Sequence, residues 1–572
     1  MERRGRTGAL ALVLVLALVA VGCGTRTAPP DGPAAPATPL AAPVDRAEPR
    51  PARPAPEPNI VLVVMDDVSA ELLATMRHAQ RMRREGASYD HSYVVDSLCC
   101  VSRASLLTGQ YPHQTGVLTN TANTPNLVGP LGGWEAFEAH GNLARSVNVR
   151  LRRAGWTTGF VGKYLNQYEY VAGEALPPTP PGWSSWQPVF GSAYDGWDFD
   201  VMTTDADGTR LEHVAAPPAW ASGREKDAAY AGTVIADRAL EFIREQEARP
   251  APYLLVVAPY AAHSRVGPDP HYPGDPGFPP AFADRPTATR PGNCGLVRCA
   301  DLDARDLPGF GDDQADNAPV RADGTRAAQW RPALAAPDPT RASATLRSRA
   351  QMVQSVDRML GRILAAVGPD TYVVLTSDNG FHLGQHGLGT GKGTAFDSDV
   401  RVPLLVIGPA VRPGVRDGLV SNLDLAPTLE DLAGLRPAPY RSGESLLPGL
   451  VDPGREDRRF TFLEHTYAPS LGLDPDASYA GGTMDDIPSY VAVRSRRALL
   501  VRYDLDPAWE GVDHAWELYD YTGSAWERRN SYADPGNRRL VERLTARLRR
   551  FDACASASGD DAVSTGCRRL TR

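Results

Sequence analysis

Short apolar segments recur along the chain and alternate with amphipathic ones. The apolar segments are rich in β-branched residues and indicate strands buried on both faces: 59–65, 253–258, 372–375 and 402–407. Helical periodicity predicts helices between them, over 70–84, 142–154, 230–248 and 342–367. Such alternation is typical of an α/β fold. We therefore expect a large mixed, mostly parallel sheet that is sandwiched by helices.

The pattern changes after about residue 445. Candidate antiparallel strands and a basic amphipathic helix follow, over 490–494, 498–503, 516–521 and 538–551. Residues 265–340 are rich in Pro, Asp and Gly and lack periodicity, which predicts a long irregular excursion over the surface. We expect the main domain over 59–445 and a smaller antiparallel α+β subdomain over 446–572.

The N-terminus has the pattern of a targeting segment. Three arginines precede an apolar run from Ala9 to Val21, which is too short to indicate a spanning helix. Small residues then lead to Cys23, as in a bacterial lipobox, whose cysteine is lipidated; ordinary cleavage nearby is the alternative. We expect a lipoprotein-type signal peptide over 1–22 and a Pro/Ala-rich tether over 23–58. These features predict an extracytoplasmic protein, at the cell surface through Cys23 or secreted.

Charge and lysine usage restrict the possible function classes and single out candidate residues. The formal net charge is −8, so the chain as a whole shows no nucleic-acid footprint. Of its 60 Lys and Arg residues, three are lysines: Lys163, Lys226 and Lys392. A chain that uses Arg almost everywhere can retain Lys where a compact ammonium is needed, or can retain it by chance.

The seven cysteines fall into distinct groups. Cys294 and Cys299, and likewise Cys554 and Cys567, are close in sequence. In an oxidising compartment such pairs suggest short-loop disulfides, with free thiols as the alternative. Cys99 and Cys100 are adjacent, which is an awkward geometry for a mutual disulfide, so this pair needs another explanation.

Acidic residues follow two of the predicted strands. Asp66 and Asp67 come after the first strand, and Asp378 and Asn379 come after 372–375. In open α/β sheets, ligands bind beyond the carboxyl ends of the strands. Three carboxylates and one amide oxygen are hard ligands that suit Ca²⁺ or Mg²⁺. A turn or a helix N-cap is the plainer role for any one of these residues.

The segment from Ser97 to Gly109, SLCCVSRASLLTG, resembles the signature of the type I sulfatase family. That signature is Cys-x-Pro-Ser-Arg followed by a helix and Thr-Gly, and Cys99 occupies its first position. The resemblance implies that a formylglycine-generating enzyme oxidises Cys99 to formylglycine. Val101 stands where the family usually has Pro, at a position that this enzyme reads.

Further segments resemble the family in the same order along the chain, from about residue 59 to 535. They are 59–67, GKYLN at 162–166, PYAAHS at 259–264, TSDNGFHLGQHG at 376–387, DVRVPL at 399–404, NLDLAPT at 422–428 and ELYD at 517–520. The GKYLN form and the Cys99-Cys100 pair are similar to N-acetylglucosamine-6-sulfatases. The resemblance therefore implies an alkaline-phosphatase-like fold and hydrolysis of a sulfated small molecule or glycan, with a glycan 6-O-sulfate preferred.

The resemblance also implies a role for each site residue. Ca²⁺, or Mg²⁺, is held by Asp66, Asp67, Cys99, Asp378 and Asn379. The catalytic residues are Cys99 as the formylglycine hydrate that supplies the nucleophile, Arg103 as its anchor, Lys163 and Lys392 as sulfate-binding cations, and His263 as the acid for the leaving oxygen. Weaker candidates for substrate binding are Asn166, His382 and His386.

Two alternatives remain at this stage. One is a phosphodiesterase or phosphonate hydrolase that uses the same fold and pocket for another tetrahedral anion. The other is a catalytically silent lipoprotein that binds sulfated glycan, which would follow if Val101 blocks oxidation of Cys99.

Overall fold

The structure is a computed structural model. It describes residues 58–122, 130–267, 269–330, 337–455, 458–467, 487–506, 511–524, 526–555 and 559–572. These residues belong to one compact unit. The signal peptide, Cys23 and the tether up to residue 57 lie outside the described residues, so those predictions stay untested. Within the described residues, no helix has both the length and the hydropathy needed to cross a membrane.

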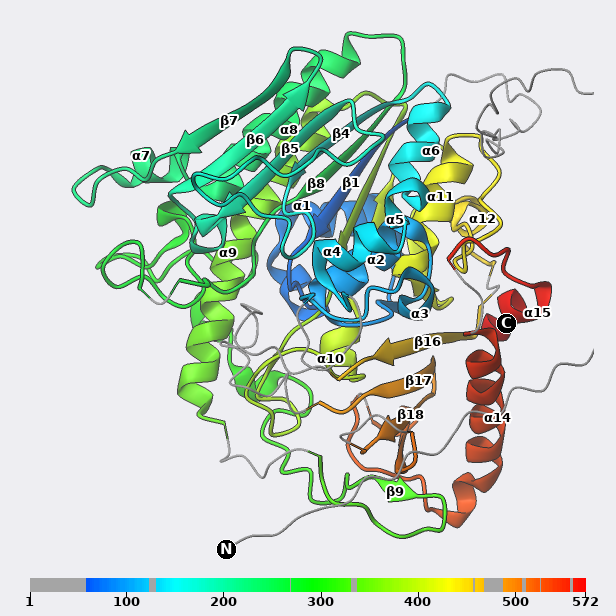
Figure 1. The fold of residues 1–572 in the computed structure, drawn as a ribbon. Helices are drawn as coiled ribbons and strands as arrows, with labels where there is room; N and C mark the ends of the chain where they lie inside the picture. The colour runs from blue at the N-terminus through cyan, green and yellow to red at the C-terminus, as the bar shows by residue number, and fades with distance from the viewer. Residues whose placement is uncertain are drawn as a thin grey trace, which may run out of the picture. The chain divides into compact units, whose positions relative to one another are not determined.

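A ten-stranded sheet forms the centre of this unit (Figure 1). In spatial order its strands are β14 (Gly414–Arg416), β2 (Ala87–Tyr89), β13 (Leu404–Ile407), β10 (Thr371–Ser377), β1 (Asn59–Met65), β8 (Tyr253–Ala258), β4 (Thr157–Gly162), β5 (Ser185–Gly191), β6 (Phe199–Asp205) and β7 (Gly208–Val214). The five consecutive strands β10, β1, β8, β4 and β5 run parallel, whereas β13, β6 and β7 are antiparallel to their neighbours. The prediction of a mixed, mostly parallel sheet is confirmed.

Helices cover both faces of the sheet. Alternate residues of β1 enter two different hydrophobic cores, since successive side chains of a strand point to opposite faces. One core includes residues of α1 (Arg77–Glu85), α8 (Ala231–Glu247) and α9 (Pro339–Ala366). The other includes residues of α2 (Cys99–Thr108), α4 (Gly133–Ala139), α6 (Val147–Arg153) and α11 (Leu425–Leu432). The predicted sandwich is therefore confirmed.

A second, five-stranded antiparallel sheet follows the first one. Its order is β16 (Phe460–His465), β17 (Tyr490–Ser495), β18 (Ala498–Asp504), β19 (His514–Asp520) and β9 (Val320–Arg321). Helix α14 (Arg538–Cys554) packs on β17 and β18 (Figure 1). Because β9 comes from the excursion at 265–340, the second sheet is not built from the C-terminal residues alone. The domain boundary at residue 445 stays a prediction.

The remaining elements are short. They include β3 (Ser92–Tyr93), β11 (His382–Leu383), β12 (Thr390–Gly391), β15 (Val420–Ser421), α3 (Pro112–Thr115), α5 (Asn142–Arg145), α7 (Gly223–Ala228), α10 (Asp397–Val400), α12 (Leu447–Val451) and α15 (Thr565–Arg568). Disulfides join Cys294 to Cys299 and Cys554 to Cys567, which confirms both predicted local pairs.

Candidate active site

Four adjacent parallel strands end at the same edge of the sheet, and the residues that follow them meet there. Strands β10 and β1 pair through Ser377 and Met65, so the residues after them emerge side by side. Strands β8 and β4 pair through Ala258 and Gly162, and they lead to His263 and Lys163. Gly162 has φ of 114°, and a Cβ on it would lie 2.0 Å from the carbonyl oxygen of Ala258, so only glycine fits this approach.

Cys99 is the first residue of α2, where the positive end of the helix dipole favours an anion. Its Sγ lies 2.8 Å from Lys392 Nζ, 3.6 Å from Asp66 Oδ1 and 3.8 Å from Asp67 Oδ1. The neighbouring Cys100 packs instead into the core beneath the sheet, where burial raises the pKa of its thiol to about 12. The two adjacent cysteines therefore lie in different environments. Only Cys99 faces a charged cluster, which includes Asp66, Asp67 and Lys392.

The carboxylates of the cluster are matched by three cations. Lys163 Nζ lies 2.7 Å from Asp66 Oδ2, and Lys392 Nζ lies 2.6 Å from Asp67 Oδ1. Arg103 Nε donates to Asp378 Oδ2 at 2.8 Å, and its Nη1 donates to the carbonyl oxygen of Lys163 at 2.8 Å. These side chains are all at least nine-tenths buried, so the interactions are poorly screened by water.

Burial and mutual charge shift the ionisation of these groups. Burial is the main cause that raises the pKa of Asp66 to about 6, and Lys163 offsets part of that rise. Burial would also raise the pKa of Asp378, but the charges of Arg103, Lys163 and Lys392 outweigh it and hold this pKa at about 2. Neighbouring carboxylates whose pKa values are pushed apart in this way are a feature of functional sites.

Asp67 adopts a strained backbone conformation. Its φ of 57° lies in the left-handed region, which a residue other than glycine occupies only where its surroundings hold it. Its amide donates to Asp378 Oδ1 at 3.1 Å, and its carbonyl oxygen accepts a hydrogen bond from Arg349 on α9. Sequence reasoning missed Arg349, because one of many arginines on a long amphipathic helix carries no distinguishing pattern.

His263 lies against the same carboxylates. Its Nε2 is 3.8 Å from Asp67 Oδ2, and its Nδ1 is 2.7 Å from the carbonyl oxygen of Ser264. Because a carbonyl only accepts, Nδ1 carries a proton, which leaves Nε2 as the atom that faces the cluster. Tyr194, a second residue that the sequence did not reveal, packs its ring against both His263 and Lys163.

The donor set fits a hard divalent cation. Ligand atoms of Asp66, Asp67, Cys99 and His263 lie within 4.8 Å of one another. Asn379 Nδ2 donates to Asp67 Oδ1 at 2.7 Å, while its buried Oδ1 has no hydrogen-bond partner within the described part of the chain. An orphaned amide oxygen beside three carboxylates is the kind of ligand that Ca²⁺ or Mg²⁺ takes. Asp378 is already engaged within the protein. Its Oδ1 accepts hydrogen bonds from the amides of Asp67 and Asn379, and its Oδ2 accepts one from Arg103.

All three weaker candidates, His382, His386 and Asn166, are buried. His382 Nδ1 is 2.9 Å from Asp399 Oδ1, and His386 Nε2 is 3.1 Å from Glu527 Oε2. Among the described residues, neither histidine forms a hydrogen bond or an ion pair with the cluster. Asn166 is buried, and its Oδ1 has no hydrogen-bond partner in the same part of the structure. Their roles stay predictions.

Comparison with known families gives matches over most of the described chain. The sulfatase family model matches residues 58–435. A second model, for the C-terminal part of N-sulphoglucosamine sulphohydrolase, matches residues 384–553. The first match contains every residue of the charged cluster.

Curated relatives agree with the family matches. The chain is 32% identical over 421 residues to the extracellular sulfatase SULF-1 homolog of Drosophila melanogaster, which covers 70% of this chain and 32% of that protein. It is 28% identical over 411 residues to human N-acetylglucosamine-6-sulfatase, which covers 69% of this chain and 64% of that protein. The chain thus matches less than two thirds of the length of these relatives.

Solved structures share the fold. A structure of a protein in complex with its substrate D-glucosamine-2-N,6-O-disulfate has a TM-score of 0.60 at 18% identity, covering 89% of this chain and 100% of that one. The phosphonate monoester hydrolase of Silicibacter pomeroyi has a TM-score of 0.59 at 21% identity, covering 87% of this chain and 95% of that one. At these identities the likeness establishes the fold alone.

Proposed function

The chain belongs to the sulfatase family, and from that premise we propose that it hydrolyses sulfate esters, with the 6-O-sulfate of N-acetylglucosamine or a related glycan as substrate. One observation carries the proposal of hydrolysis. Cys99 lies at the start of α2, within hydrogen-bond distance of Lys392 and beside Asp66 and Asp67. A nucleophile position, a hard-cation donor set and fixed cations meet in one buried cluster.

The proposed reaction requires two groups that are not encoded side chains: a divalent cation and formylglycine. Asp66, Asp67, Asp378 and Asn379, with the side chain at position 99, would hold a divalent cation, for which Ca²⁺ is preferred and Mg²⁺ is the alternative. When bound, such a cation supplies positive charge that favours an ionised nucleophile and neutralises sulfate oxygens. Formylglycine at position 99 supplies, as its hydrate, a hydroxyl nucleophile in place of a thiol.

The residues of the chain then bind and orient the ester. Lys163 and Lys392 now pair with Asp66 and Asp67, and their ammonium groups also hold the anionic oxygens of the sulfate. Arg103 fixes Asp378 and anchors the side chain at position 99. Preorganised charges of this kind act where charge develops in the transition state and need no reorganisation.

His263 provides the proton for the leaving alcohol. Its Nδ1 proton is fixed by Ser264, so Nε2 is the atom that gains and donates the proton. Burial of His263 beside Asp67 excludes bulk water from this transfer.

The glycan 6-O-sulfate is supported by two observations. The GKYLN segment at 162–166 is similar to N-acetylglucosamine-6-sulfatases, and one of the curated relatives carries that name. Asn166 presents a buried amide oxygen beside the strand that delivers Lys163, and such a group can accept a hydrogen bond from a sugar.

A mass measurement combined with a substrate panel tests the proposal. In protein from the native host, the tryptic peptide Glu85–Arg103 should show sulfur replaced by oxygen and the loss of two hydrogens. Turnover of N-acetylglucosamine-6-sulfate should exceed that of an aryl sulfate and of a phosphonate monoester. An unmodified Cys99 thiol with no turnover would instead favour the silent glycan-binding lipoprotein. Preferred turnover of the phosphonate ester would favour the phosphonate hydrolase.

We further propose an extracytoplasmic location, with a lipid anchor at Cys23. Two disulfides support an oxidising compartment. The anchor rests on the sequence pattern before Cys23. Cys23→Ser should move the protein from the membrane fraction to the soluble fraction, and an unchanged distribution would contradict the anchor.

A further inference from the structure

Helix α14 concentrates arginine on a chain whose net charge is negative. Six of its 17 residues are arginines, and the formal charge of the whole chain is −8. Arg539, Arg543, Arg547 and Arg550 are spaced by four, four and three residues, so they form one stripe along the helix. The stripe spans roughly 16 Å, at about 1.5 Å per helical residue.

Three of the four arginines in the stripe are exposed and form no ion pair within the described residues, although the exposed Glu542 lies on the same helix. Arg539, Arg543 and Arg550 are exposed, as is Arg459, which precedes β16. Among the described residues, none of these four takes part in an ion pair. Arg547 is partly buried, and its guanidinium lies 3.7 Å from the centre of the Phe460 ring.

The arginines repel one another. The pKa of Arg547 is lowered, first by burial and then by the charges of Arg550, Arg543 and Arg459. Arg547 and the three arginines that lower its pKa therefore lie close enough to interact electrostatically. Like charges at helical spacings of three and four residues destabilise a helix. The stripe is therefore a feature that folding alone does not favour.

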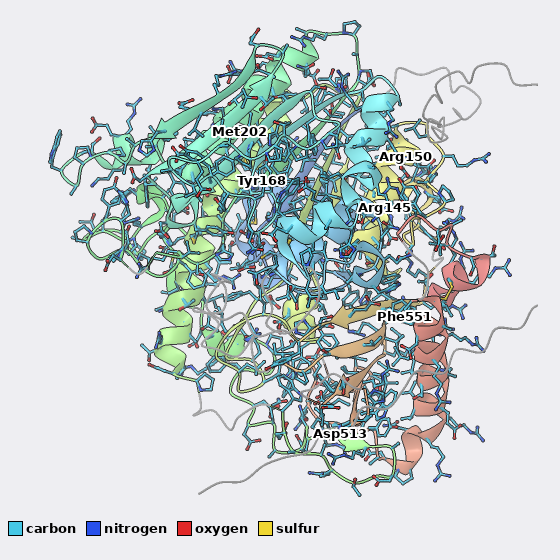
Figure 2. All side chains as sticks on the ribbon, viewed as in Figure 1. Arg145, Arg150, Tyr168, Met202, Asp513 and Phe551 are labelled. Atoms are coloured by element: carbon cyan, nitrogen blue, oxygen red, sulfur yellow. A yellow bond between two sulfur atoms is a disulfide. The ribbon has the colours of Figure 1, made fainter. Side chains whose placement is uncertain are left out.

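Packing accounts for Arg547, which also donates to the carbonyl oxygens of Leu570 and Arg572, but not for the three exposed arginines of the stripe. A different side of α14 supplies the contacts to the sheet, through Leu544, Leu548 and Phe551. Phe551 stacks on Phe462 of β16 at 4.3 Å and lies between the helix and that strand (Figure 2). Because the apolar side is occupied in this way, α14 has no free apolar face with which to enter a membrane.

We propose that the arginine stripe of α14, together with Arg459, is a binding surface for a sulfated polysaccharide, distinct from the buried site that cleaves the ester. A row of guanidinium groups matches a linear polyanion, because each group can form two parallel hydrogen bonds to the oxygens of one anionic group. The choice of polymer rests on the proposed function, in which the substrate is a sulfated glycan. Docking of the polymer on α14 would raise its concentration near the cluster around Cys99.

A charge-matched pair of triple variants tests the surface. The stripe variant is Arg539→Gln/Arg543→Gln/Arg550→Gln, which spares Arg547 because that residue contacts Phe460. The control is Arg152→Gln/Arg153→Gln/Arg249→Gln, three exposed arginines outside α14 that form no ion pair in the described structure. Both variants remove the same charge from the full chain. Binding of a fluorescent heparin octasaccharide is measured by anisotropy over a salt series, and thermal unfolding is measured alongside it.

The stripe variant should lose about tenfold or more in affinity at low salt, with a shallower salt dependence, since fewer counterions are exchanged. The control should lose much less, and neither variant should melt at a lower temperature. Equal losses in both variants, or no loss in the stripe variant, would overturn the proposal.

A second arm tests the source of the anion. Wild-type protein should prefer the octasaccharide over vesicles of phosphatidylcholine and phosphatidylglycerol in a 3:1 ratio, and over a DNA duplex of equal charge. Equal or tighter binding to vesicles or DNA would overturn the assignment to a polysaccharide. The binding assay needs no turnover, so an inactive enzyme would refute the proposed function without deciding this surface.

Discussion

Two buried clusters of charge in this protein have opposite characters. In one, Glu430 of α11 receives two hydrogen bonds from Arg441, at 2.8 and 2.6 Å, and one from the amide of Ala438. Arg150 reaches the same carboxylate from α6 (Figure 2), at 2.6 Å. In the other cluster, around Cys99, Asn379 Oδ1 has no hydrogen-bond partner among the described residues and Asp67 is held at positive φ.

The cluster around Glu430 stabilises the fold, whereas the cluster around Cys99 is arranged to bind a ligand. Around Glu430 both carboxylate oxygens already accept hydrogen bonds, from Arg441 and from the amide of Ala438, and Arg150 adds an ion pair. Around Cys99 the buried Oδ1 of Asn379 and Nη2 of Arg103 have no hydrogen-bond partner among the described residues, and the pKa of Asp66 is raised to about 6. Unsatisfied buried groups cost free energy, and they persist where function requires them. Substitutions in the two clusters should therefore separate activity from stability.

The largest effect is expected from Asp378→Ala. Removing this carboxylate takes away one metal ligand and the partner of Arg103, so kcat/KM should fall by about 10⁴-fold or more. The measurement is turnover of a sulfate ester with added calcium, and a chelator should cause a comparable loss in the wild type. Full wild-type activity in the presence of chelator would contradict the metal assignment.

Glu430→Gln should act on stability instead. It leaves Arg441 buried without its counter-charge, and breaking a buried pair in this way costs about 3–5 kcal/mol. The free energy of unfolding, from urea titration, should fall by that amount, while kcat per folded molecule stays at the wild-type value. A loss of kcat without a loss of stability would remove the distinction between the two clusters.

Lys392→Arg tests the chemistry of one cation at constant charge. A planar guanidinium cannot replace an ammonium that contacts both Cys99 Sγ and Asp67 Oδ1, so kcat should fall by about 10²-fold with the fold intact. The matched control is Lys226→Arg, because Lys226 is also buried and instead donates to the carbonyl oxygen of Ala219. Wild-type kcat in the Lys392 variant would exclude Lys392 from the site.

How well each feature could be predicted from the sequence depends on whether it arises from a local pattern or from contacts between distant segments. The strand ends at Asp66 and Asp378 were predictable, because buried parallel strands are continuous apolar runs and the residues after them meet at one edge. Strands β4 to β7 were missed, since their sequences mix Gly, Thr and charged residues with apolar ones. The predicted helix at 142–154 is divided at Ser146, where extended backbone separates α5 from α6.

Side-chain contacts between distant segments were the least predictable part. The pairing of Lys163 with Asp66 could be expected only through the resemblance to a family, because 97 residues separate the two. The contact between Arg349 and the carbonyl oxygen of Asp67 had no pattern at all, since a backbone acceptor leaves no trace in the sequence of its donor.

The smallest effect is expected from Arg349→Lys, and it is the one that ties the strain in Asp67 to function. Arg349 is fully buried, and its guanidinium lies 4.3 Å from the centre of the Phe381 ring. Burial lowers its pKa to about 10, so keeping this charge inside the protein is costly. Lysine keeps the charge but lacks the planar group that stacks on Phe381 while it donates to Asp67.

Loss of this hydrogen bond should let the peptide of Asp67 relax toward negative φ and turn its carboxylate away from Cys99. We expect calcium affinity, measured by isothermal titration, and kcat to fall together by about tenfold, with little change in thermal unfolding. Arg358→Lys is the matched control on the same helix, since Arg358 pairs with Asp284 and should leave calcium affinity unchanged. If Arg349→Lys lowered stability and left calcium affinity intact, Arg349 would belong with Arg441 among the residues that only hold the fold.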